Sequence, residues 1–118
     1  MSTSAANEPS SIVIDLAAMR RRLGSDDELI REILAGFLVA LPSLRAQLEA
    51  AVTKCDQKMR TRAAHALRGA LLDIAALPAA ELARRIEFAS DDCAELLASL
   101  STQLDAIATT AARIVATG

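Results

Sequence analysis

Apolar residues recur every three or four positions along most of this chain, the spacing that places side chains on one face of a helix. The longest such series lies near the C-terminal end: Cys93, Leu96 or Leu97, Leu100, Leu104, Ile107, Ala111 and Ile114. Its steps alternate between four and three, as they do along the seam of a helix bundle. No segment has the pattern of a strand, so the sequence predicts an all-α protein.

A second apolar series predicts one long helix nearer the N-terminus. Its positions are Leu29, Ile33, Phe37, Leu41, Leu44 and Leu48. The series keeps one register across Pro42, so we expect a single helix that is kinked there, because proline removes one backbone hydrogen bond. Two helices divided at the proline are the alternative.

Capping residues predict where the first helix ends and where the second and third helices begin. A short helix from about Asp15 to Leu23 would end at Gly24, a residue that favours the C-terminal cap. Ser25 and Glu28 have the spacing of a capping box, which predicts that Ser25 starts the long helix. Cys55-Asp56 forms the next turn, and Asp56 or a neighbour caps the third helix.

Proline and a polar triplet mark the remaining boundaries. The third helix is expected to end near Ala76, because Pro78 disfavours helical geometry in the residue before it. A fourth helix would span about 79–89 with Leu82 and Ile86 inward. The triplet Ser90-Asp91-Asp92 would start the last helix.

These elements predict an antiparallel four-helix bundle with a short N-terminal helix across one end. A chain of 118 residues suffices for one such domain, which we expect over residues 12–118. The polar residues 1–11 are expected to form a disordered tail. Because the bundle can fill its own core, we expect a monomer.

Composition narrows the range of functions. Hydrophobic residues make up 53% of the chain but only two are aromatic, so the core must be aliphatic. The net charge of −2 gives no electrostatic basis for binding nucleic acid or an anionic membrane. We expect a cytoplasmic protein, because no segment has the pattern of a signal peptide or a membrane span. Cys55 and Cys93 stand alone, which favours a reducing compartment and no metal site.

The only histidine, His65, occupies an unusual place in the third helix. The expected buried stripe of that helix is Met59, Ala63, Leu67, Ala70 and Ile74. His65 projects to the opposite, solvated side, between Arg62 and Arg68. Gly69 follows one turn later, in mid-helix, where glycine costs about 1 kcal/mol relative to alanine. A solvated surface histidine with no chemical role is the simpler interpretation.

The segment Ala64-His65-Ala66-Leu67-Arg68-Gly69-Ala70, with Leu82, Ile86 and Glu87 further on, resembles the histidine phosphotransfer (HPt) domain of multistep two-component phosphorelays. The segments Ile14-Asp15-Leu16 and Leu23-Gly24-Ser25-Asp26-Asp27-Glu28-Leu29 are similar to that family's first helix and the start of its second. The resemblance covers about residues 13–115.

The resemblance implies that His65 accepts a phosphoryl group from a receiver-domain aspartate and passes it to another response regulator. It gives Arg68 the role of stabilising the phosphoryl group and Gly69 that of leaving room for it. The partners implied are receiver domains or a hybrid histidine kinase, and Mg²⁺ would be held by the receiver. The chain would need no cofactor of its own.

Autophosphorylation is not expected, because the chain has no glycine-rich phosphate loop and the residue after His65 is Ala66, not an acid. We therefore expect a phosphoryl carrier and not an enzyme. Two alternatives remain open: a helical adaptor that docks a receiver or kinase without carrying phosphate, and an unrelated helical protein that binds a partner helix.

Leu72 departs from the family pattern, which usually has a small residue two turns after the histidine. An exposed leucine there predicts a docking contact for a receiver, or a group that narrows the choice of partner. Thr61 and Arg62 are further docking candidates. Leu34 and Leu38 either extend this patch or pack against the short first helix. Ala75 also stands where the family commonly has glycine, and Asp73 where asparagine is frequent.

Overall fold

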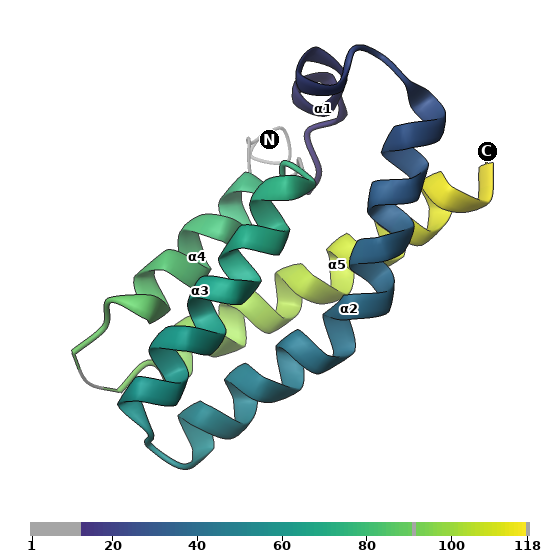
Figure 1. Cartoon of the computed structure of the whole chain (residues 1–118). Coiled ribbons are helices and arrows are strands. Elements are labelled where there is room, and N and C mark those ends of the chain that lie inside the picture. Colours follow the sequence, from purple (N-terminus) through teal and green to yellow (C-terminus); the bar gives the residue numbers. More distant parts are fainter. Residues whose placement is uncertain (1–12, 91, 118) are drawn as a thin grey trace, which may run out of the picture.

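A computed structural model describes residues 13–90 and 92–117, which form five helices and no strand (Figure 1). The helices are α1 (Leu16–Leu23), α2 (Asp27–Thr53), α3 (Gln57–Asp73), α4 (Leu77–Glu87) and α5 (Ala94–Thr117). The all-helical architecture predicted from the sequence is therefore confirmed for this part of the chain. The predicted tail, residues 1–11, lies outside the described residues, as does Asp91.

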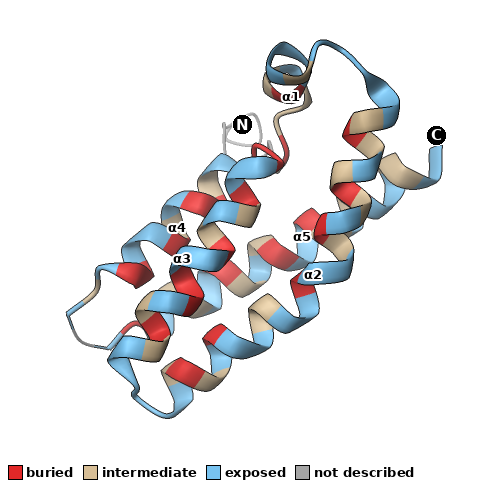
Figure 2. Cartoon of the chain, in the orientation of Figure 1, coloured by how far each residue is buried: buried red, intermediate tan, exposed pale blue. Residues whose placement is uncertain are grey.

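Each of the four helices α2 to α5 packs against two others of this set. α2 contacts α3 and α5, α4 contacts the same two helices, and α1 packs on α2 near the end away from the α2–α3 turn (Figure 1). The inward sides carry the buried residues (Figure 2). The largest fully buried side chains are Met19, Leu34, Leu48, Leu67, Leu71, Ile74, Ile86, Leu100, Leu104 and Ile107. The core is thus mainly aliphatic, as the composition indicates, and Phe37 is its one aromatic residue in the described part of the chain.

Aspartates begin three of the helices. Asp15, Asp26 and Asp56 each accept a hydrogen bond from the backbone N–H three residues on, at 3.0, 3.1 and 3.0 Å. The expected capping box at Ser25 is wrong. Ser25 has a φ of 61° and its N–H donates to the carbonyl oxygen of Arg20, so it terminates α1 and leaves the start of α2 to Asp26.

α2 passes through Pro42 as one helix, so the alternative of two helices is wrong. Buried residues on both sides of the proline, Phe37 and Leu41 before it and Leu48 after it, hold this helix against the core. The lost hydrogen bond is offset by this packing, because tertiary contacts supply most of a helix's stability. The kink stays a prediction.

α3 ends at Asp73, three residues before the expected position near Ala76. Ala75 has a φ of 54°, and its N–H donates to the carbonyl oxygen of Leu72, while the N–H of Ala76 donates to that of Leu71. These two bonds form a Schellman motif, which stops the helix independently of Pro78. Pro78 instead lies in the first turn of α4, where its missing N–H costs nothing, so α4 begins and ends about two residues early.

The first helix also contacts the end of α3. The guanidinium of Arg22 donates to the carbonyl oxygens of Leu72, at 3.2 Å, and Asp73. The N–H of Asp15 donates to the carbonyl oxygen of Ala75 at 3.0 Å. Arg22 of α1 therefore adds partners for the carbonyls of Leu72 and Asp73 at the end of α3, and Asp15 bonds the turn that follows that helix.

The buried face of α3 is broader than its apolar stripe. Ala63, Leu67 and Ile74 are buried as expected, but Met59 and Ala70 are only half-buried. Arg60, Ala64 and Leu71 are buried as well, because α4 packs beside α3 on that side. Along the described helices, none is both long and apolar enough to cross a membrane.

Candidate functional site

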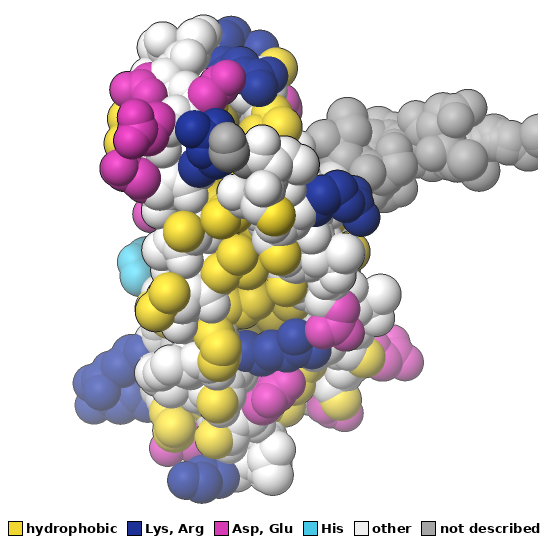
Figure 3. Space-filling model, turned by 90° about the vertical axis from the view of Figure 1, so that its right-hand side faces the viewer, with side chains coloured by type: hydrophobic (Ala, Val, Ile, Leu, Met, Phe, Trp, Pro, Cys, Tyr) yellow, Lys and Arg dark blue, Asp and Glu magenta, His cyan; other side chains and the backbone are white. Residues whose placement is uncertain are grey.

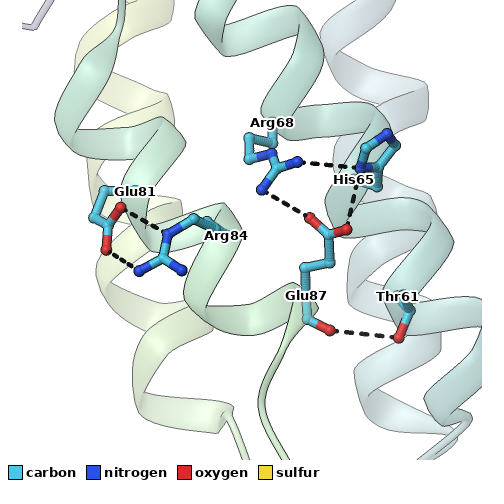
Figure 4. Close-up of polar contacts among 6 residues, drawn as sticks. All are labelled: Thr61, His65, Arg68, Glu81, Arg84 and Glu87. Atoms are coloured by element: carbon cyan, nitrogen blue, oxygen red, sulfur yellow. Dashed lines mark hydrogen bonds and ion pairs between the residues drawn. The ribbon is translucent and has the colours of Figure 1, made fainter.

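His65 lies on the outer side of α3, opposite the C-terminal end of α4 (Figure 4). Its side chain is 66% exposed. Figure 3 shows the histidine side chain in cyan, standing out from the outline of the molecule. The ring nitrogen Nδ1 is 3.1 Å from Oε2 of Glu87, the last residue of α4. Glu87 is only 8% exposed, so an exposed imidazole meets a buried carboxylate.

Arg68, one turn after His65, completes a cluster of three side chains (Figure 4). Its Nη1 is 3.3 Å from Oε1 of Glu87, an ion-pair contact. The pair lacks hydrogen-bond alignment, since Oε1 has no hydrogen-bond partner among the described residues. Nη2 of Arg68 is 3.4 Å from Nδ1 of His65. The guanidinium thus contacts both the carboxylate and the ring, which also contact each other, and it balances the buried charge of Glu87.

The contacts of Nδ1 determine where the proton of the neutral imidazole lies. Nδ1 cannot both donate to Glu87 and accept from Arg68. An ionised carboxylate only accepts, and the contact with Glu87 is the shorter, so Nδ1–H donates to Oε2. The lone pair of the neutral ring is then on Nε2. A nitrogen nucleophile held in this way is available without a further base.

The backbone at the end of α4 is held by the first turns of α3. Oγ1 of Thr61 donates to the carbonyl oxygen of Gln57 at 3.0 Å and lies 3.4 Å from that of Glu87. Nη2 of Arg60 donates to the carbonyl oxygen of Ala89. Thr61 is therefore half-buried and contacts the residue whose side chain holds His65.

Gly69 faces open space. A Cβ added there would meet no other atom within 4 Å, so close helix packing does not explain the glycine. Because Gly69 is one turn after His65, its missing side chain leaves the surface beside the imidazole uncovered.

A shallow hollow of about 200 Å³ adjoins the cluster, lined by Arg68, Leu72, Leu77, Ala80, Glu81 and Arg84. Leu72 is 45% exposed and Leu77, from the start of α4, is 49% exposed. Hydrogen bonds from the Arg84 guanidinium lower the pKa of the Glu81 carboxyl below its ordinary value, so this rim carries an exposed ion pair (Figure 4). Leu77 was not predicted as part of this exposed apolar surface, because Leu72 is on another helix and no short-range spacing connects the two residues.

The other docking candidates lie elsewhere. Leu34 is fully buried in the core, so the expectation that it extends an exposed patch is wrong. The apolar face of α2 is wide because it packs against α1 as well as α3 and α5, which leaves Leu38 half-buried at its margin. Arg62 is exposed on the flank of α3 that faces α2, beside Met59 and Gln47.

Comparison with known proteins identifies the chain. A family model described as Hpt domain matches residues 32–110, which include α3, α4 and the whole His65 cluster. The chain belongs to the Hpt domain family. Hpt domains are phosphoryl carriers of two-component phosphorelays and interact with response-regulator receiver domains. Searches of curated proteins and of solved structures gave no significant match.

Within residues 13–90 and 92–117, no group of three or more His, Cys, Asp or Glu side chains could hold a metal ion. Glu87 entered the sequence prediction only as part of the family pattern, and its place beside His65 was not predicted. Its contact with His65 joins positions 22 residues apart, which helical periodicity cannot connect.

Proposed function

We propose that this chain shuttles phosphoryl groups through His65, accepting them from a receiver-domain aspartate and passing them to another response regulator. The observation that carries the proposal is the contact between Nδ1 of His65 and the buried carboxylate of Glu87. It leaves Nε2 as the unprotonated nitrogen on an exposed ring, where a second protein can reach it.

In the accepting step, the lone pair of Nε2 attacks the phosphorus of an aspartyl phosphate. The N–P bond forms as the P–O bond to the aspartate breaks, and the carboxylate leaves with the electron pair. Nδ1–H stays in place, and the positive charge of the phosphorylated ring faces the carboxylate of Glu87. Donation to the second regulator is the same step in reverse, so one site serves both directions.

Arg68 and Gly69 have complementary roles in this proposal. Arg68 is within one turn of the acceptor and can donate hydrogen bonds to phosphoryl oxygens, a strong interaction because both groups are charged. Gly69 leaves uncovered the surface over which the phosphoryl group arrives. Glu87 keeps the guanidinium close to the ring until then.

A receiver would dock over His65 and the hollow beside it. Leu72 and Leu77 supply exposed apolar surface from two helices there, and apolar surface of this kind marks interaction sites. Thr61 lies beside this surface through its contact with the carbonyl oxygen of Glu87, whereas Arg62 and Leu38 stay docking predictions from the sequence. The divalent metal of the reaction belongs to the receiver, and we propose that this chain has no autokinase activity.

We also propose that α2 to α5 form the antiparallel bundle expected from the sequence, with α1 across one end. In this proposal residues 12–118 are a single monomeric domain, working in the cytoplasm where receivers and kinase domains operate.

The proposal is tested by incubating the protein with phosphorylated receiver domains and recording its intact mass. Acid-labile, alkali-stable phosphate is expected on the wild type and not on His65→Gln, whose fold should be intact because residue 65 is exposed. Label on a correctly folded His65→Gln protein would refute the assignment. Receiver binding that is unaffected by His65→Gln, without label on either protein, would favour the adaptor.

A further inference from the structure

A second polar site lies away from the His65 cluster. An open cavity of about 350 Å³ is formed where the α2–α3 turn meets the connection from α4 to α5, at the lower left in Figure 1. None of His65, Arg68 and Glu87 lines it. Its polar surface comes from Gln57, Arg60, Ser90 and Asp92.

Arg60 is the unusual member of this lining. It is only 8% exposed, and its buried Nε has no hydrogen-bond partner among the described residues. Nη2 donates to the carbonyl oxygen of Ala89, a neutral group. In the described part of the chain, no ion pair involves Arg60.

A guanidinium remains protonated in proteins, and a buried charge is costly unless an opposite charge and hydrogen bonds compensate it. The backbone carbonyl of Ala89 accepts one hydrogen bond from the Arg60 guanidinium, but because it is uncharged it does not balance the positive charge. The cavity of about 350 Å³ is far larger than the roughly 10–15 Å³ that one water molecule needs, so it has room for a polyatomic ion.

We propose that this cavity binds a small oxyanion, a phosphate or a carboxylate group, on the guanidinium of Arg60. The planar fork of arginine matches two oxygens of such an ion. The amide of Gln57 and the hydroxyl of Ser90 add neutral donors to the same cavity. Asp92 opposes binding, but its Oδ1 already accepts from the N–H of Ala94 at the start of α5, at 3.0 Å.

The cavity is connected to the end of α4 through adjacent residues. Arg60 bonds the carbonyl oxygen of Ala89, and the next residue, Thr61, contacts that of Glu87. An ion on Arg60 would therefore change the surroundings of the backbone at Ala89 and Ser90. The amide signals of these residues report occupancy directly, without any phosphotransfer assay.

The test is a titration of ¹⁵N-labelled protein with sodium phosphate, and separately with sodium acetate, with chloride adjusted to hold ionic strength constant. We expect saturable shifts at Gln57, Arg60, Ala89 and Ser90. Arg60→Met should weaken affinity about tenfold or more, because it removes charge-assisted hydrogen bonds. The matched control is Arg21→Met, which also replaces an arginine by methionine. Arg21 is exposed on α1, far from the cavity, so this variant should leave the affinity for phosphate or acetate unchanged.

A second variant covers the case in which Arg60→Met does not fold. Ser90 is exposed at the cavity, so Ser90→Leu should fold, narrow the cavity and reduce phosphate affinity while Arg60 is intact. Saturation by phosphate and not acetate would identify a phosphate site, and the reverse a carboxylate site. Shifts without saturation, or shifts unchanged in Arg60→Met or Ser90→Leu, would mean an adventitious surface ion only and would overturn the proposal.

Discussion

The carboxylate of Glu87 is almost completely buried, while the ring of His65, whose Nδ1 it contacts at 3.1 Å, is largely exposed. Burial restricts the carboxylate, since Glu87 is the last residue of α4 and its side chain faces α3. The exposed ring can then be held in one orientation and one tautomer without being covered. A ring nitrogen is thereby both positioned and accessible.

Removing Glu87 should slow phosphoryl transfer. Glu87→Ala loses a charge-assisted hydrogen bond, so we expect the rate of phosphoryl transfer to fall by up to about tenfold. Glu87→Gln keeps an acceptor oxygen and should lose less. ¹⁵N spectra of the imidazole should show the Nδ1–H tautomer in the wild type and a mixture in Glu87→Ala. The matched control is Glu49→Ala, an exposed acid on α2. Equal tautomers and rates in all four proteins would contradict the role of Glu87.

Replacing Arg68 should slow transfer without abolishing it. Arg68→Ala removes the cation that can bond phosphoryl oxygens, which predicts a loss of roughly ten- to a hundredfold in single-turnover transfer from a phosphorylated receiver. His65 remains as acceptor, so the mass of the fully labelled product should be unchanged. Arg21→Ala, an exposed change of the same charge, is the control. A complete loss of label would indicate that Arg68 is needed for more than stabilising the phosphoryl group.

Trimming the two leucines of the hollow should weaken receiver binding. Leu72→Ala and Leu77→Ala each remove apolar surface that is about half exposed, so folding should change little. A loss of about 1 kcal/mol per leucine would raise the Kd about fivefold. Isothermal titration with a receiver measures it, and Val39→Ala, a well-exposed apolar residue on α2, is the control. An unchanged Kd in the double variant would exclude the hollow as a docking site.

Replacing Cys55 by glycine should stabilise the protein. It is exposed and has a φ of 55°, in the left-handed region where a side chain costs about 1 kcal/mol. Cys55→Gly should therefore raise the Tm by about 4 °C. Cys55→Ala keeps the Cβ and should give no such gain. If the two variants melted together, the backbone at the α2–α3 turn would not be strained.

The sequence predicted helices and their starts well where these depend on residues only a few positions apart. The apolar spacing of α2 and α5 and the side chains of Asp15 and Asp56 act within a few positions, so their effects could be derived from the chain alone. Ser25 was misassigned because its left-handed backbone depends on how α1 turns into α2. The early end of α3 has a similar origin in Ala75, which adopts the left-handed conformation that glycine favours.

Much of the candidate site could not be derived in this way. The exposure of His65 follows from its position opposite the apolar stripe, and it was predicted. The contact of His65 with Glu87 depends on the position of α4 along the axis of α3, which no short-range pattern in the sequence encodes. Leu34 illustrates the same limit, because its burial results from the broad face that α2 presents to three other helices.

The hydrogen bonds that Arg22 and Asp15 make with the end of α3 determine how long a working fragment must be. The family model begins at residue 32, whereas these bonds come from residues 15 and 22. A protein trimmed to the matched segment would lose the bonds from Arg22 to the carbonyls of Leu72 and Asp73 and from Asp15 to that of Ala75, which would loosen the end of α3 where Leu72 lies. The smallest unit that keeps this surface in shape is therefore longer than the segment by which the family is recognised.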